Sequence, residues 1–250
     1  MRFKIKDTKL LKDLIAAVKI LETEVTMRVN EGGILIRLMD PSRVAMVDLD
    51  VTKAIFEEFE CKEPLKIGLS LAELDKLLKR SGKEDATTIE LNANTGKLQI
   101  TIAGKYTRVF TLPTLEASEE EVPTPKITFN SEIKFITDSL KQALEDAQLV
   151  SDHVKMTTVE DGLEIDATGD LMTAHAKLDK NSGSLLDVAV KEQSHAVYSL
   201  KYVMQIVTVA QVLADIGVLE FSTEMPVKLS FEKDAVIKLT YWVAPRIETE

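Results

Sequence analysis

Apolar residues recur at helical spacing in four stretches of the chain. In the first, Leu11, Leu14, Val18 and Leu21 form a stripe with the three- and four-residue steps of one helix face. The same spacing predicts helices over residues 8–22, 70–81, 131–149 and 199–213. Ser70 is a good N-cap and Glu73 completes a capping box, and Ser131 is the expected cap of the third helix.

Between these helices, apolar and polar residues alternate with the period of two that is typical of strands. Residues 25–29 and 34–38 alternate around Asn30-Glu31-Gly32-Gly33, which predicts a hairpin. Residues 98–102 and 237–243 alternate in the same way. Hairpins are too frequent and helices too few for a doubly wound parallel sheet. The pattern predicts an α+β fold in which each half is an antiparallel sheet with two helices on one face.

The same pattern of apolar and polar positions occurs twice along the chain. Val25, Met27 and Gly33 recur as Val154, Met156 and Gly162, an offset of 129 residues (154 − 25). A repeat of this length indicates a duplicated domain rather than a solenoid. We expect domains over residues 1–112 and 127–250, joined by an extended, solvated connector over residues 113–126 that carries three prolines and three consecutive glutamates.

Composition narrows the class of protein. The single cysteine, Cys61, excludes an internal disulfide framework, and no apolar run approaches the length of a membrane span. The first residues lack the apolar core of a signal peptide, so we expect an intracellular protein. The formal charge of −10 argues against nucleic acid when taken alone, but the distribution of charge over the surface matters more than its sum.

Several segments together resemble the proliferating cell nuclear antigen (PCNA) family, the sliding clamps of archaea and eukaryotes. The resemblance covers nearly the whole chain, and its most specific parts are the Met39-Asp40-Pro41-Ser42-Arg43-Val44 segment and the terminal Ala244-Pro245-Arg246-Ile247. It implies a trimeric ring with helices inside and sheets outside. Such a ring encircles duplex DNA without reading its sequence and without catalysing a reaction, so no catalytic residue, metal or cofactor is expected.

The resemblance assigns the cationic side chains of the helices to DNA. Lys76, Lys79, Arg80 and Lys83 have the spacing of one face opposite the leucine stripe of the second helix. Acidic residues outnumber lysines on the third helix, and the fourth carries one lysine. The expected DNA-facing set is Lys9, Lys12, Lys19, Lys76, Lys79, Arg80, Lys83, Lys141 and Lys201. An acidic exterior would repel DNA from outside the ring.

Partners of such clamps insert a short hydrophobic peptide between the two domains, beneath the connector. They include DNA polymerase, the clamp loader (replication factor C), flap endonuclease and DNA ligase. The matching positions here are Met39, Val44, Val122, Pro226, Trp242, Val243, Ala244 and Pro245. We expect Trp242 to be exposed as a wall of this pocket, whereas Val243 is equally consistent with a core position.

Ring closure requires edge strands that pair between subunits. The candidates are residues 105–112 and 173–178, with the contact residues Lys105, Arg108, Phe110, Thr173, His175 and Lys177. Arg108 is expected to reach an acid of the third helix, Glu145 or Asp138. A clamp of this kind is expected at the nucleoid in the cytoplasm of an archaeon, or in the nucleus of a eukaryote.

Two other readings compete with the sliding clamp. One is a clamp-like subunit that works only in a heterotrimer, with a regulatory or checkpoint role. The other is a carboxylate-dependent hydrolase, since Asp48 and Asp50 share one strand face. The chain has no GxGxxG, Walker A or GxSxG motif, and its three histidines lack metal-ligand spacing.

Overall fold

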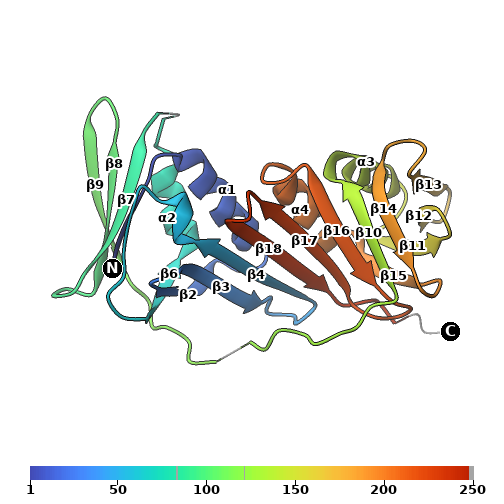
Figure 1. The fold of residues 1–250 in the computed structure, drawn as a ribbon, viewed down its shortest axis with the longest axis horizontal. Helices are drawn as coiled ribbons and strands as arrows, with labels where there is room; N and C mark the ends of the chain where they lie inside the picture. Colours follow the sequence, from blue (N-terminus) through green and yellow to red (C-terminus); the bar gives the residue numbers. More distant parts are fainter. Residues whose placement is uncertain (83, 121, 248–250) are drawn as a thin grey trace. The chain divides into compact units, whose positions relative to one another are not determined.

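The structure is a computed structural model that describes residues 1–82, 84–120 and 122–247. The chain forms two compact units (Figure 1). Unit 1 comprises Met1–Pro41, Val47–Val122 and Lys233–Leu239, and unit 2 comprises Ser42–Met46, Pro123–Glu232 and Thr240–Glu250.

The duplication predicted from the sequence is confirmed element by element. In the first half of the chain the order is β1 (Arg2–Ile5), α1 (Thr8–Lys19), β2 (Glu24–Asn30), β3 (Gly33–Met39), β4 (Ala45–Thr52), η1 (Lys53–Ile55), β5 (Glu58–Glu60), β6 (Leu65–Ser70), α2 (Leu71–Leu78), β7 (Ala86–Asn92), β8 (Lys97–Ala103) and β9 (Thr107–Pro113). The second half repeats it as β10 (Ser131–Ile136), α3 (Thr137–Gln148), β11 (His153–Val159), β12 (Gly162–Thr168), β13 (Thr173–Asp179), β14 (Leu185–Val190), β15 (His195–Ser199), α4 (Leu200–Gln211), β16 (Ile216–Phe221), β17 (Val227–Lys233) and β18 (Ile237–Val243).

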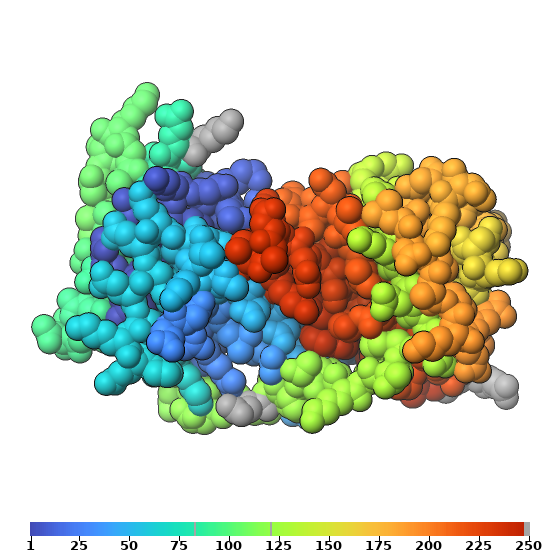
Figure 2. Space-filling view, viewed as in Figure 1, coloured from blue at the N-terminus to red at the C-terminus, as the bar shows by residue number. Residues whose placement is uncertain are grey.

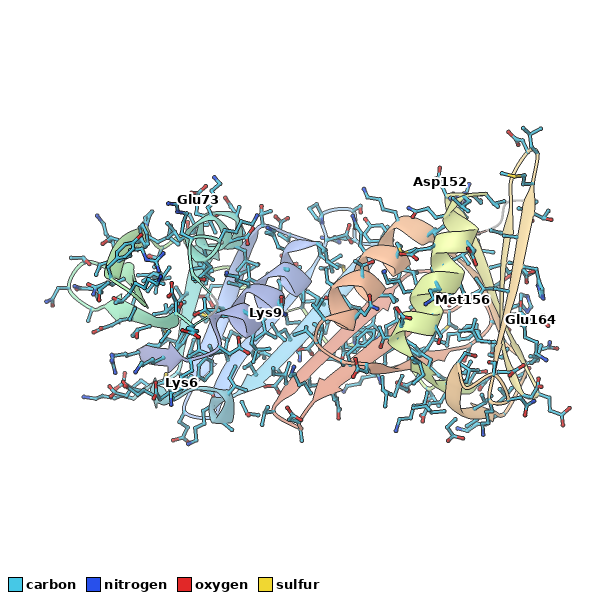
Figure 3. All side chains as sticks on the ribbon, turned by 90° about the horizontal axis from the view of Figure 1, so that it is seen from above. Lys6, Lys9, Glu73, Asp152, Met156 and Glu164 are labelled. Atoms are coloured by element: carbon cyan, nitrogen blue, oxygen red, sulfur yellow. The ribbon has the colours of Figure 1, made fainter. Side chains whose placement is uncertain are left out.

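The strands are antiparallel, as the hairpin signals predict. The described strands form three sheets. Their neighbour orders are β5-β1-β7-β8-β9, β14-β10-β16-β17-β18-β4-β3-β2-β6 and β13-β12-β11-β15. In unit 2, α3 and α4 lie side by side over the strands, as Figure 3 shows looking onto these helices.

Each helix buries the apolar stripe that predicted it. In α2, Leu71, Leu74 and Leu78 are buried against the core of unit 1, and full burial of a leucine side chain contributes about 1.5–3 kcal/mol. The hydroxyl of Ser70 accepts a hydrogen bond from the backbone N–H of Glu73 at 3.3 Å, which confirms the predicted cap. The carboxylate of Glu73, the other member of the predicted capping box, accepts a hydrogen bond from Lys76.

The predicted start of the third helix is wrong. Ser131 is a buried residue at the start of strand β10, and α3 begins six residues later at Thr137. The Ser131 hydroxyl lies 3.1 Å from that of Ser194 and bonds within a buried hydroxyl cluster rather than capping a helix. The alternation of Ile133 and Phe135, both buried, is the strand signal that the helical pattern masked.

The first part of the connector is anchored to unit 1, and most of the described residues of the connector are exposed, as its composition predicts. The N–H of Leu115 donates to the carbonyl of Gly68 at 2.8 Å, which covers the free edge of β6. Further along, the N–H of Ser118 donates to the Thr26 hydroxyl at 2.8 Å. The green atoms of this segment lie on the surface in Figure 2.

Candidate nucleic-acid interface

The helices of unit 1 carry a layer of lysines on the side opposite their buried stripe. Lys9, Lys12 and Lys19 come from α1, Lys76 from α2, and Lys79 is the C-cap residue of α2. The side chains of Lys9, Lys76 and Lys79 are about two-thirds exposed, at 65%, 67% and 67%. We call this set the helix-layer lysines; Lys9 and Glu73 of this layer are labelled in Figure 3.

Most helix-layer lysines contact a carboxylate of the same layer. The Nζ of Lys9 lies 2.7 Å from the carboxylate of Asp13 one turn on, and this hydrogen bond raises the pKa of Lys9. Lys76 pairs with Glu73. Lys12 instead donates to the carbonyl of Ser81 at 3.2 Å. The layer therefore presents ammonium groups that are paired but accessible, which suits weak and exchangeable contacts with phosphates.

Asp75 joins the two helices and was not identified from the sequence. Its carboxylate accepts from Lys19 of α1 and from Lys79, whose Nζ lies 3.0 Å from Oδ2. Burial raises the pKa of Asp75, but the hydrogen bonds from both lysines outweigh this and hold the pKa below its ordinary value. The signal in the sequence is an acid inside the leucine stripe, four residues after Leu71.

The predicted single face of four cations on the second helix is only partly formed. Lys76 lies on α2, but the helix ends at Leu78 and Lys79 is its cap. Arg80 is exposed in the turn that follows. Lys83 lies outside the described residues. Helical spacing therefore does not hold beyond Lys79, because the segment continues as a turn instead of a further helical turn.

The helices of unit 2 offer fewer cations. Lys141 of α3 is held 3.0 Å from Glu145, and its side chain is 24% exposed. Asp138 accepts from the amides of Gln142 and Gln211, at 2.6 and 2.7 Å. Lys201 of α4 is exposed. The positive charge of the helix layers is thus concentrated in unit 1.

Arg108 of β9 is held inside its own unit. Its guanidinium pairs with Asp85, donates to the carbonyl of Arg80 and lies 5.0 Å from the ring centroid of Tyr106. A hydrogen bond from the N–H of Gly82 lowers the pKa of the Asp85 carboxyl, burial raises it, and hydrogen bonding to Arg108 lowers it. The hydrogen bonds outweigh burial, so this pKa lies below its ordinary value. The predicted reach of Arg108 to Glu145 or Asp138 is a contact between subunits and stays a prediction.

Two long strands, β9 and β13, each have only one neighbour among the described strands. Val109 of β9 is 57% exposed, and Phe110 on the other face is half-buried. Lys105 lies in the turn before β9. The tip of the β8–β9 hairpin stands out from unit 1 in Figure 1. An unpaired strand edge of this length is a template for pairing with another chain.

The outward face of β13 carries alternating polar side chains. Thr173, His175 and Lys177 are all exposed. His175 Nδ1 lies 2.7 Å from Asp166, and this hydrogen bond raises the pKa of His175. Lys177 lies 3.0 Å from the carboxylate of Asp161.

The residues that match the partner-peptide pocket divide between the two units. In unit 2, the N–H of Ala244 donates to the carbonyl of Val44 at 2.8 Å, and Pro226, Ala244 and Pro245 are half-buried. The predicted exposure of Trp242 is wrong, since the residue is 7% exposed. Val243 is fully buried in unit 2. Met39 and Val122 belong to unit 1. Met39 is 39% exposed, and Val122 is half-buried.

Gly68 allows the connector to pass close over β6. A Cβ at this position would lie 2.6 Å from the carbonyl oxygens of Leu115 and Glu116, which are backbone atoms with little freedom to move. Lys66 of the same strand holds the connector through Glu119 at 2.6 Å and lowers the pKa of that carboxyl. The absence of a side chain at Gly68 is a second feature that sequence reasoning missed.

Substitution Gly68→Ala should detach the first part of the connector from β6. We expect amide hydrogen exchange at Leu115 and Ser118 to accelerate at least about tenfold, because the added methyl displaces the backbone that makes the Leu115 hydrogen bond. Gly82→Ala is the matched control, since its Cβ would meet Asp85 no closer than 3.5 Å. Unchanged exchange at Leu115 in Gly68→Ala would contradict this account.

The carboxylates considered for hydrolysis do not form a catalytic pair. Asp48 accepts from Arg37, with an Nε–Oδ2 distance of 2.9 Å, and Asp50 is exposed. Within residues 1–82, 84–120 and 122–247, no group of three or more His, Cys, Asp and Glu side chains is arranged to hold a metal ion. No helix of this described part has both the length and the apolar character needed to span a membrane.

Comparisons of this chain with known proteins all point to one protein family. Residues 1–116 match the sequence model of the PCNA N-terminal domain, and residues 123–246 match that of the C-terminal domain. The chain is 37% identical over 242 residues to "DNA polymerase sliding clamp 1" of Pyrobaculum aerophilum, covering 97% of this chain and 96% of that protein. It is 35% identical to "DNA polymerase sliding clamp" of Pyrococcus furiosus, covering 94% of each.

Solved structures share the fold. PCNA from Thermococcus kodakaraensis superposes with a TM-score of 0.91 at 24% identity, over 98% of this chain and 99% of that one. A chain of the PCNA2–PCNA3 complex from Sulfolobus tokodaii gives a TM-score of 0.90 at 25% identity, over 99% and 100%. With two domain models that together span almost all of its length, the chain belongs to the proliferating cell nuclear antigen family.

Proposed function

We propose that this protein is a DNA sliding clamp: three copies close into a ring that encircles duplex DNA and tethers DNA polymerase to it. The main observation in support of the proposal is that β9 and β13 each leave one strand edge unpaired among the described strands. The other edges among the described strands are short, irregular or covered: β5 has three residues, β14 is paired to β10 with a register irregularity, the connector bonds to Gly68 of β6, and the N–H of Arg246 donates to the carbonyl of Val197 of β15. A chain with one free edge in each half can join head to tail, and such contacts close into rings.

The charge distribution supports duplex DNA as the encircled partner. The helix-layer lysines supply attraction to phosphates with no means of reading bases. The protein as a whole has a formal charge of −10, so its remaining surface repels DNA. In this proposal β9 of one copy pairs with β13 of the next, and the helix layers face the duplex.

The ring acts as a platform and performs no chemistry. Polymerase, the clamp loader, flap endonuclease and ligase would each dock a short hydrophobic peptide against residues that include Val44, Pro226 and Ala244. The half-buried state of these residues in unit 2 supports a surface that accepts apolar side chains. The protein would accordingly reside with chromosomal DNA.

Retention on circular DNA tests this function most simply. The clamp is loaded on a nicked plasmid by its loader ATPase, and bound protein is separated from free protein by gel filtration. A topological clamp stays on the closed circle and leaves after a single-site nuclease linearises it. Equal retention on circle and line, or no retention on either, would reject encirclement.

A further inference from the structure

Asp75 is a nearly buried carboxylate within a surface that must attract phosphates. It is 8% exposed and lies on α2, where it contacts Lys19 of α1 and Lys79 at once. Burying a charge is costly unless it is paired, and here two ammonium groups pair with it. The arrangement places an anion beneath two of the helix-layer lysines.

The fold itself does not require an acid at this position. The counterpart of Asp75 in the second half is Met204 (75 + 129), which lies on α4 and is also 8% exposed. The counterparts of Lys19 and Lys79 are Gln148 and Thr208, so the whole ionic group is absent from unit 2. The same helix pair therefore packs with an apolar side chain at the position of Asp75.

A carboxylate and a phosphate oxygen bind the same ammonium protons. While Lys19 and Lys79 donate to Asp75, their charge is partly neutralised and their side chains are directed to the helix pair. Contact with DNA then requires exchange of one anion for another. Because Asp75 is 8% exposed, a lysine that turns to a phosphate leaves the buried carboxylate with fewer partners, so each such exchange works against binding of DNA.

We propose that Asp75 is a built-in competitor of the DNA phosphates for Lys19 and Lys79, and that it limits how tightly the ring holds the duplex. This inference rests on the proposed encirclement of DNA by the helix layers. A weaker hold favours sliding, since each phosphate contact must break as the clamp advances.

The test is the affinity of the full-length clamp for a 30-base-pair duplex probe, followed by fluorescence anisotropy at several salt concentrations between about 50 and 200 mM. Asp75→Asn should bind about tenfold more tightly than the wild type. The salt dependence should also steepen, by about 0.9 in log–log slope for each phosphate newly contacted. Asp187→Asn is the matched control, because it removes an exposed acid of β14, which pairs with Lys180, with the same change in net charge.

A second comparison separates competition from a general charge effect. In Asp75→Asn combined with Lys19→Gln and Lys79→Gln, the gain in affinity should disappear. If Asp75→Asn does not fold, Asp75→Met carries the same prediction, since the second half of the chain uses methionine there. Thermal unfolding and ring mass are measured for every variant.

The outcomes distinguish this inference from the proposed function. If the wild type stays on circular DNA but Asp75→Asn binds no more tightly than Asp187→Asn, the role of Asp75 is rejected and the proposed sliding-clamp function is retained. If the triple variant keeps the full gain, competition for these lysines is likewise rejected. Failure of the wild type to be retained on circles rejects the proposed function itself.

Discussion

Replacing Val109 by proline should convert the ring into single subunits that still fold. Val109 lies in the middle of the free edge of β9, and its side chain is 57% exposed. Proline is tolerated on an edge strand but cannot donate a hydrogen bond to a neighbouring strand. The expected result is a change of molar mass from three chains to one, with normal circular dichroism and no retention on circular DNA.

The register of β9 shows why this position is decisive. Pro113 is opposite Lys97 in β8, and because a proline in a strand is accommodated where its nitrogen faces the free edge, we expect this pair to be non-bonded. Hydrogen-bonded and non-bonded pairs alternate along an antiparallel ladder, which places Thr111 and Val109 in the non-bonded class. Their N–H groups therefore point away from β8 and toward the free edge.

The control for this substitution is Val109→Thr. It keeps the N–H and the β-branched shape while changing the side chain, so the ring should persist. A lost ladder bond costs about 0.5–1.5 kcal/mol net, and the proline ring adds a steric conflict at each of the three interfaces. Val109→Pro particles with the mass of three chains would show that β9 is not the joining edge.

Reversing the charge of Lys76 and Lys79 should remove most of the stimulation of DNA synthesis. Lys76→Glu with Lys79→Glu changes the charge by four units in each subunit, on a surface proposed to face the duplex. Repulsion of phosphates should lower clamp-dependent extension by a cognate polymerase about tenfold or more at a physiological ionic strength of about 0.15 M. The variant should keep the mass of the ring, because neither lysine lies on β9 or β13.

The matched control places the same change on another surface. Lys180 and Lys228 pair with Asp187 and Glu220 away from the helices, so Lys180→Glu with Lys228→Glu alters the total charge equally. Normal stimulation is expected for this control. Normal stimulation by Lys76→Glu with Lys79→Glu would mean that α2 does not face the DNA.

The sequence predicted the elements whose signal is local. The leucine stripe of α2 and the Ser70 cap depend on residues within one or two turns, and both are present. The offset of 129 residues likewise predicted two equivalent halves, because duplicated folds keep their apolar positions. The prediction that Ser131 caps the third helix failed because serine is favoured both at helix caps and in buried hydroxyl clusters. Only its partner Ser194, far away in the sequence, decides between the two.

The remaining features depend on contacts between residues far apart in the chain. The pairing of Asp75 with Lys19 joins residues 56 positions apart, and Arg108 meets Asp85 across 23 positions. The anchoring of Leu115 on Gly68 depends on the path of the connector over a strand. Trp242 is buried because the last residues of β18 are buried on both faces, which alternation cannot reveal.

The molar mass of the purified protein in solution tests the central claim most directly. Light scattering after gel filtration, at several protein concentrations, should approach three times the chain mass of 27.8 kDa, about 83 kDa. Dilution should lower this value toward one chain if the ring dissociates, without a stable dimer. A mass of one chain at every concentration, or a mass that stops at two chains, would contradict closure of three copies into a ring.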